Sequence, residues 1–271
     1  MSFTFKTIAT LGVLMGSLAL AGCGQDEKDP NHIKVGVIVG AEQQVAEAAQ
    51  KVAKEKYGLD VELVTFNDYV LPNEALSKGD IDVNAFQHKP YLDQQIKDRG
   101  YKLVPVGNTF VYPIAGYSKK IQSLDELQAG AQVAIPNDPT NLGRSLLLLQ
   151  KVGLIKLKDD VGLLPTVLDV TENPKKLKLV ELEAPQLPRS LDDQQIALAV
   201  INTTYASQIG LTPAKDGIFV EDKESPYVNM IVAREDNKEA ENVKKFVQAY
   251  QSEEVDQAAN KIFNGGAVKG W

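Results

Sequence analysis

Side chains that could bind a small ligand follow four strand-like runs of the 271-residue chain, and one more lies on a later extended run. In open α/β sheets, ligands bind beyond the carboxyl ends of strands, so these positions suit a site. Aromatic rings follow the first two runs, and amides with one arginine follow the other two. Rings favour apolar groups, whereas a guanidinium favours a carboxylate or phosphate. The candidates are Tyr69, Phe86, His88, Tyr91, Arg144, Asn202 and Asn229.

Arg144 has the most specific chemistry of these candidates. We expect Thr140 or Asn141 to cap its helix, which places Arg144 in or near the first turn. A cation there is unfavourable by about 0.3–1 kcal/mol unless an anion offsets it. Together with the exposed backbone N–H groups, the guanidinium would form a site for a carboxylate or phosphate. Alternatively, Arg144 pairs with a neighbouring acid such as Asp138, or points to solvent.

The remaining candidates have structural interpretations as well. The four ring-bearing side chains would together line an apolar pocket, although each taken singly is more often a core or surface residue. Asn202 lies at a strand end and Asn229 on an extended run. An asparagine in either place is at least as often a turn or cap residue as a ligand-binding one.

Signatures of common enzyme classes are missing from the sequence. It contains no G-x-G-x-x-G fingerprint, no Walker loop and no G-x-S-x-G elbow. His32 and His88 are the only histidines, whereas transition-metal sites usually draw on several imidazoles or thiolates. The net charge of −7 disfavours nucleic acid, because phosphate binding requires clustered Lys and Arg. We therefore expect a protein that is not an enzyme and uses no cofactor or metal.

The N-terminus is similar to a bacterial lipoprotein signal. Lys6 precedes an apolar run over 8–20, which is shorter than the roughly 20 residues that span a bilayer. The run ends in Leu20-Ala21-Gly22-Cys23. We expect residues 1–22 to be a signal peptide, Cys23 to be acylated and anchored in a lipid bilayer, and 23–32 to form a polar tether. The alternative is an ordinary signal peptide whose cysteine is incidental.

Strand-like and helix-like segments alternate along the rest of the chain, which predicts an α/β protein with mostly parallel sheets covered on both faces. The β-branched run at 33–39 is followed by an amphipathic helix over 41–57. The further predicted strands are 61–66, 81–86, 132–136, 177–183 and 196–201, and the further predicted helices are 71–78, 90–100, 123–128, 141–152, 204–209 and most of 236–263.

Two extended stretches interrupt this alternation. Residues 103–117 contain consecutive extended runs with no helix between them, and 227–233 is extended again. We interpret both as crossings between two lobes: lobe 1 from 33–110 and 228–271, and lobe 2 from 111–227. Two crossings form a hinge, and a hinge between α/β lobes creates a cleft that can close on a ligand.

A family resemblance is carried by three segments: VNAFQHKPYLD at 83–93, PNDPTNLGR at 136–144 and INTTYA at 201–206. They closely resemble the methionine-binding lipoproteins of the NlpA lipoprotein family, which are substrate-binding subunits of bacterial methionine ABC importers. The likeness covers essentially the whole chain, signal included. It implies a two-lobed periplasmic-binding-protein fold of type II-like organisation.

The resemblance also implies residue roles and partners. Arg144 would bind the ligand carboxylate, Asn202 and Asn229 its polar end, and the four ring-bearing candidates the thioether. L-methionine, with D-methionine as the alternative, would be the ligand, and the membrane and ATPase subunits of the importer would be the protein partners. The partner of the ligand ammonium stays open, because Asp68 and Asp138 are the only acids at the strand ends.

Two questions remain open at this point. Gly24 follows the cysteine, and in enteric bacteria a residue other than aspartate there usually permits sorting to the outer membrane, whereas a transporter receptor is expected at the inner membrane. The protein would face the periplasm in either case. The competing functions are a surface lipoprotein that acts through protein–protein contacts, a receptor for a methionine derivative or short peptide, and an extracytoplasmic enzyme on the same scaffold.

Overall fold

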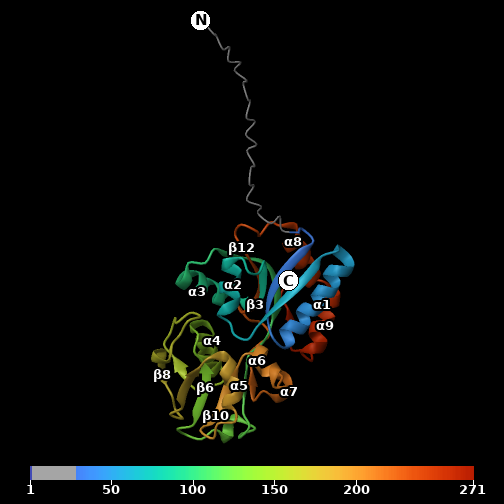
Figure 1. Ribbon diagram of the computed structural model, residues 1–271. Coiled ribbons are helices and arrows are strands. Elements are labelled where there is room, and N and C mark those ends of the chain that lie inside the picture. The colour runs from blue at the N-terminus through green and yellow to red at the C-terminus, as the bar shows by residue number, and fades with distance from the viewer. Residues whose placement is uncertain (2–28) are drawn as a thin grey trace.

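Two β-sheets, each with its own helices, organise the chain (Figure 1). The computed structural model describes Met1 and residues 29–271. The expected signal peptide, the lipidation site Cys23 and Gly24 therefore lie outside the described residues. We call the six-stranded sheet with its helices lobe 1 and the five-stranded sheet with its helices lobe 2.

The lobe 1 sheet has the strand order β13-β4-β12-β3-β1-β2. Strand β1 pairs in parallel with β2 and β3, whereas β12 is antiparallel to both β3 and β4, and β13 is antiparallel to β4. The strands are β1 His32–Ile38, β2 Asp60–Phe66, β3 Val83–His88, β4 Leu103–Val111, β12 Val228–Arg234 and β13 Val268–Lys269.

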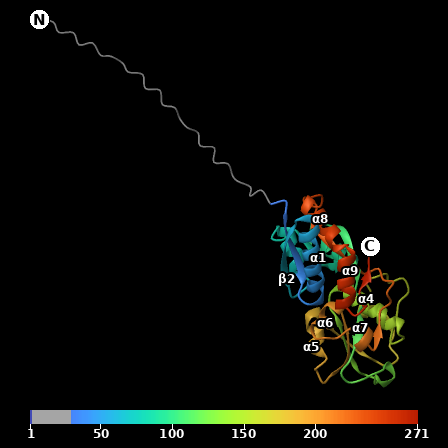
Figure 2. The ribbon, with the colours of Figure 1, turned by 90° about the vertical axis from the view of Figure 1, so that its right-hand side faces the viewer.

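Helices cover both faces of this sheet, because its central strands are apolar on both sides. In β12, Ile231 and Ala233 join the core beneath three helices, while Met230 and Val232 join the core on the opposite face. The three helices α1, α8 and α9 lie together on one side of the lobe (Figure 2). They are α1 Ala41–Tyr57, α8 Glu241–Tyr250 and α9 Glu253–Ile262, and the other face carries α2 Leu71–Lys78 and α3 Lys89–Arg99.

The lobe 2 sheet has the order β11-β5-β10-β6-β9, and β10 again contributes alternate residues to two cores. Its strands are β5 Ala115–Tyr117, β6 Gln132–Pro136, β9 Lys178–Leu182, β10 Ile196–Ile201 and β11 Phe219–Val220. Its helices are α4 Pro139–Lys151 on one face, α5 Leu187–Ser190 and α6 Thr203–Gln208 on the other, and α7 Pro213–Asp216 beside β11. A small sheet pairs β7 Lys156–Leu157 with β8 Val170–Glu172, and 3₁₀ turns span Leu124–Glu126, Val167–Asp169 and Ala184–Gln186.

Two short segments link the lobes, and they lie side by side. The first, 112–114, connects β4 to β5, and the second, 221–227, connects β11 to β12. The backbone N–H of Glu221 donates to the carbonyl oxygen of Ile114 at 2.9 Å, which joins the two segments directly. We call them crossing 1 and crossing 2.

The expectation of mostly parallel sheets is wrong, because both sheets are mixed. Strand–helix–strand units give the parallel pairs of β1 with β2 and β3, and of β6 with β9 and β10. The strands next to the crossings enter without such a helix, and they pair antiparallel.

Two local expectations are also corrected. The predicted helix over 123–128 is a single 3₁₀ turn at Leu124–Glu126. The helical stretch near the C-terminus breaks between α8 and α9, where Ser252 caps α9 by accepting a hydrogen bond from the Val255 N–H. Within residues 29–271, no helix combines the length and the apolar character needed to cross a bilayer.

At Gly143, helix α4 comes so close to a loop of lobe 2 that a side chain larger than that of glycine does not fit. A Cβ atom at this position would lie 2.4 Å from the carbonyl oxygen of Leu163 and 3.0 Å from Pro165 Cδ. Alanine normally stabilises a helix by about 1 kcal/mol relative to glycine, but forcing an atom into packed surroundings costs about 1–3 kcal/mol. We expect Gly143→Ala to lower the melting temperature, measured by circular dichroism.

The control is Lys97→Ala at an exposed position of α3, which should leave the melting temperature nearly unchanged. An increase in the melting temperature of Gly143→Ala would contradict the close packing of this loop.

Candidate functional site

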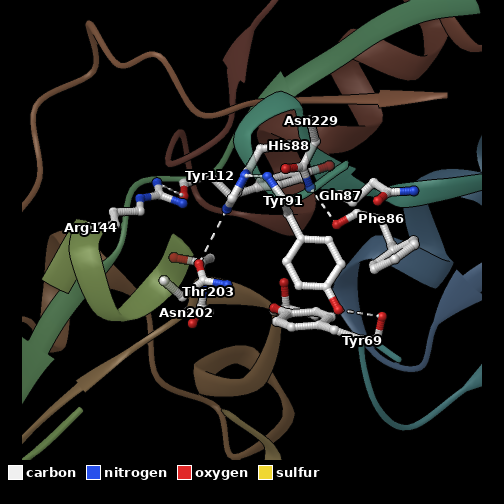
Figure 3. Close-up of a pocket in the computed structure, with 12 residues that line it drawn as sticks. Tyr69, Phe86, Gln87, His88, Tyr91, Tyr112, Arg144, Asn202, Thr203 and Asn229 are labelled. Atoms are coloured by element: carbon white, nitrogen blue, oxygen red, sulfur yellow. Dashed lines mark hydrogen bonds between the residues drawn. The ribbon is translucent and has the colours of Figure 1, made fainter. Parts of the chain in front are cut away.

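A narrow cavity lies between the lobes, beyond the carboxyl ends of β3 and β10 (Figure 3). It contains about 340 Å³ of space between protein atoms, part of it open solvent. All seven candidate residues from the sequence line it. The lining consists of Tyr69, Phe86, Gln87, His88, Tyr91, Tyr112, Asn141, Arg144, Asn202, Thr203, Thr204 and Asn229.

One side of the cavity is a wall of rings from lobe 1. Tyr69 follows β2, Phe86 lies within β3, and Tyr91 lies in the first turn of α3. The centroids of Tyr69 and Phe86 are 5.8 Å apart, and each ring lies 6.0 Å from Tyr91. The Tyr91 hydroxyl donates to the Tyr69 carbonyl oxygen at 2.8 Å, which holds the wall together. Such edges and faces suit a soft, apolar side chain.

His88 links this wall to lobe 2. It caps α3, because its Nδ1 accepts the Tyr91 N–H at 3.2 Å. Its Nε2 lies 3.3 Å from Asn141 Oδ1 on α4, and with Nδ1 accepting, Nε2 is the donor. Burial, with the nearby Arg144 cation, lowers the pKa of His88 to about 3, so the ring is neutral at physiological pH.

The start of α4 differs from the expected one. Asp138 caps the helix by accepting the Asn141 N–H at 3.0 Å, and Pro139 takes the first helical position that proline favours. Arg144 therefore lies in the second turn rather than the first. The Asn141 N–H of the first turn is taken by the Asp138 side chain, and Arg144 lies a turn beyond it, so the anion site expected at the first turn is not formed in this way.

The Arg144 side chain is buried and already paired. Its Nε donates to Glu221 Oε1 at 2.9 Å, and its Nη2 donates to Glu221 Oε2 and to the Tyr112 carbonyl oxygen. The guanidinium carbon lies 4.4 Å from the centroid of the Tyr227 ring, a cation–π contact. The partner is thus Glu221 of crossing 2, and neither Asp138 nor solvent.

Amide groups complete the polar side of the cavity. Asn202 Nδ2 donates to Asn141 Oδ1 at 2.8 Å, and Asn229 Nδ2 donates to the Phe86 carbonyl oxygen at 2.9 Å. Asn202 Oδ1 and the Tyr112 hydroxyl are buried without a hydrogen-bond partner among the described residues. An unpaired buried polar atom is costly, and because Asn202 lines the cavity, its Oδ1 is a group that a polar ligand would satisfy.

Glu42 lies at the contact between the lobes, next to the cavity. This second residue of α1 accepts a hydrogen bond from the hydroxyl of Thr204, which is on α6 and lines the cavity. Burial raises the pKa of Glu42 to about 8, against the smaller opposing effect of the Thr204 hydrogen bond. The carboxyl group is mostly neutral at pH 7.

Within residues 29–271, no three His, Cys, Asp or Glu side chains converge in a way that could hold an ion.

A sequence model of the family described as NlpA lipoprotein matches residues 33–271. The chain belongs to the NlpA lipoprotein family.

Proteins similar to this NlpA-family protein in sequence and in structure include methionine-binding and substrate-binding proteins. The D-methionine-binding lipoprotein MetQ of Escherichia coli strain K12 is 89% identical over 271 residues, covering 100% of both chains. A nutrient binding protein from Burkholderia cenocepacia, solved bound to methionine, is 53% identical with a TM-score of 0.85, covering 88% of this chain and 100% of that one. A periplasmic substrate-binding protein of an ABC transporter from Coxiella burnetii is 50% identical with the same TM-score and coverage. These matches confirm the predicted periplasmic-binding-protein fold.

Five cavity residues of this NlpA-family protein were not among the sequence candidates. Four of them lie in the same strand-end segments as the candidates: Gln87, Asn141, Thr203 and Thr204. Position after a strand points to these segments, but it does not tell which of their residues line the cavity. Tyr112 lies in crossing 1, where no strand-end signal exists, and only its place between the lobes brings it to the cavity.

The buried Glu42 gives this NlpA-family protein a pH-dependent stability. The unfolded carboxyl ionises near 4.5 and the folded one near 8, so between these values the unfolded state binds fewer protons. The free energy of unfolding therefore falls as the pH rises across this window. Glu42→Gln removes this pH dependence. The melting temperature of the variant minus that of wild type should therefore increase steadily from about pH 5 to about pH 8.

The matched control is Glu47→Gln, an exposed residue of the same helix, whose difference from wild type should not change with pH in this way. A pH-independent difference for Glu42→Gln would show that this carboxyl group does not titrate as described.

Proposed function

We propose that this protein is a lipid-anchored receptor at the cell envelope that binds methionine between its lobes and delivers it to an ABC importer. The observation that carries the proposal is the division of the cavity. Rings form one side, while Arg144 and amides form the other. Methionine has the same division between a thioether and a zwitterionic end. The names of the relatives, one methionine-binding and one an ABC-transporter protein, support the same function.

The energetics of the two sides are complementary. Burying a side chain of methionine's size contributes roughly 1.5–3 kcal/mol, and each sulfur–aromatic contact about 0.3–1.5 kcal/mol. The free Nη1 of Arg144 would bind the carboxylate, because within the described structure Nε and Nη2 carry its hydrogen bonds. The unpaired Asn202 Oδ1 would accept from the ammonium, and Asn229, which lines another part of the cavity, would contact the polar end of the ligand as well.

Binding would require the lobes to move. The cavity is narrow and lined by residues of both lobes, so a ligand of methionine's size would enter when the lobes separate. We propose that 33–110 with 228–271 moves relative to 111–227, and that the crossings act as the hinge. The role is capture and delivery rather than catalysis, in line with the substrate-binding relatives.

Arg144→Gln tests the polar side of the cavity. Calorimetry on protein that has been unfolded and refolded to remove bound ligand should show tight one-to-one binding of methionine by wild type, with both enantiomers titrated. The variant should lose at least about 2 kcal/mol, as expected when one partner of a buried charge pair is removed. Arg189→Gln, the same change at an exposed position of α5, is the control. Unchanged affinity in Arg144→Gln would remove this residue from the site.

Cys23→Ser tests the lipid anchor. We expect wild type in the membrane fraction, with fatty acid on its first mature residue by mass spectrometry of the N-terminal peptide. The serine variant cannot form the thioether to lipid and should lack this modification. An unmodified cysteine in the wild-type protein would contradict lipid anchoring, but it would not bear on the proposal that the protein binds methionine. Separating inner from outer membranes in the same experiment identifies the membrane that holds the protein.

A further inference from the structure

Glu221 lies directly behind the cavity without lining it. Both oxygens of its carboxylate accept hydrogen bonds from Arg144, Oε1 from Nε and Oε2 from Nη2. The two side chains are 13% and 3% exposed, respectively, so the ion pair is shielded from water. Glu221 Oε2 also lies 3.4 Å from the Ile114 N–H of crossing 1, which helps to fix the carboxylate. Removing one partner of such a pair leaves an uncompensated buried charge.

The ion pair with Glu221 determines which N–H donors of Arg144 remain available to a ligand. A guanidinium has five N–H donors. Three of them are used, one from Nε and two from Nη2, on Glu221 and the Tyr112 carbonyl oxygen. The face of the group rests on Tyr227. Within residues 29–271, Nη1 is the guanidinium nitrogen left without a hydrogen bond, and a ligand oxygen can use it.

Glu221 also sets the charge around the cavity. Arg144 is the only lining side chain with a charge at neutral pH, because His88 is neutral and the others are phenols, amides, hydroxyls and one phenyl ring. Glu221 cancels that charge from behind. Asp138 is not among the lining residues, and its carboxylate accepts hydrogen bonds from Thr140 and Asn141. A cavity whose one charged lining side chain is balanced by Glu221 disfavours a ligand that carries a net charge into it.

We propose that Glu221 is a specificity-determining residue, which cancels the charge of Arg144 and so makes the cavity select zwitterionic amino acids over carboxylic acids without an amino group. This inference rests on the proposed function. It concerns which ligands with the same side chain are accepted, and not whether methionine binds.

The experiment compares L-methionine with 4-(methylthio)butanoate, which has the same thioether chain and carboxylate but no ammonium. Both are titrated calorimetrically at neutral pH into the mature, detergent-solubilised lipoprotein, after unfolding and refolding to remove bound ligand. The variants are Glu221→Gln, which keeps the shape, and Glu221→Ser, which leaves room for water beside the guanidinium. The quantity compared is the ratio of the two dissociation constants.

The dissociation constant of the analogue divided by that of methionine should fall by at least about tenfold in either neutral variant. The guanidinium is then no longer balanced by a carboxylate and favours an anionic ligand. Glu221→Asp keeps the charge and should keep the discrimination. The matched control is Asp222→Asn, which removes the same charge one residue away, where Asp222 is exposed and paired with Lys151. Its ratio should equal that of wild type.

Two results would overturn the inference. An unchanged ratio in a folded neutral variant would leave Glu221 a purely structural partner of Arg144. An equal gain for both ligands would make Glu221 a competitor for the carboxylate site instead of a selector of charge. Failure of wild type to bind methionine would refute the proposed function itself, and that outcome is visible before any variant is compared.

Discussion

The buried guanidinium of Arg144 is the constraint around which the cavity is built. A cation in such surroundings costs several kcal/mol unless it is paired and hydrogen-bonded. Helix α4 carries the arginine, and its partners come from two other places in the chain: crossing 1 supplies the Tyr112 carbonyl oxygen, and crossing 2 supplies Glu221 and Tyr227. The guanidinium is therefore held by the segments that link the lobes, so the proposed ligand contact and the proposed hinge belong to one contact network.

The polar network extends from this point across the cavity through neutral groups. Asp138 orients Asn141, whose Oδ1 receives hydrogen bonds from His88 of lobe 1 and Asn202 of lobe 2. Because the histidine stays neutral, the network does not add a second charge. The aromatic wall opposite is held by ring packing and by the hydroxyl of Tyr91. The cavity thus separates a charge-balanced polar side from an apolar one.

The sequence predicted the parts of the site that depend on local pattern. An apolar run followed by a turn marks a strand end, and every candidate chosen on that basis or on the later extended run lines the cavity. Contacts between distant segments could not be read in the same way. Glu221 lies 77 residues from Arg144, and Tyr112 reaches the cavity only because crossing 1 passes between the lobes. The mixed sheets were missed for the same reason, since the pairing of β12 with β3 and β4 depends on how the chain returns to lobe 1.

Hydrogen bonds between the lobes connect them independently of any cargo. Thr204 bonds Glu42, Gln208 Nε2 donates to the Val39 carbonyl oxygen at 2.9 Å, and His88 bonds Asn141. Each contributes a net of about 0.5–1.5 kcal/mol. If the lobes separate to release a ligand, as proposed above, these bonds must break first, so they would lengthen the residence time of a bound molecule. Unloading then depends on a transporter that holds the two halves apart, and the rate of that separation, rather than affinity, would limit how fast cargo is handed over.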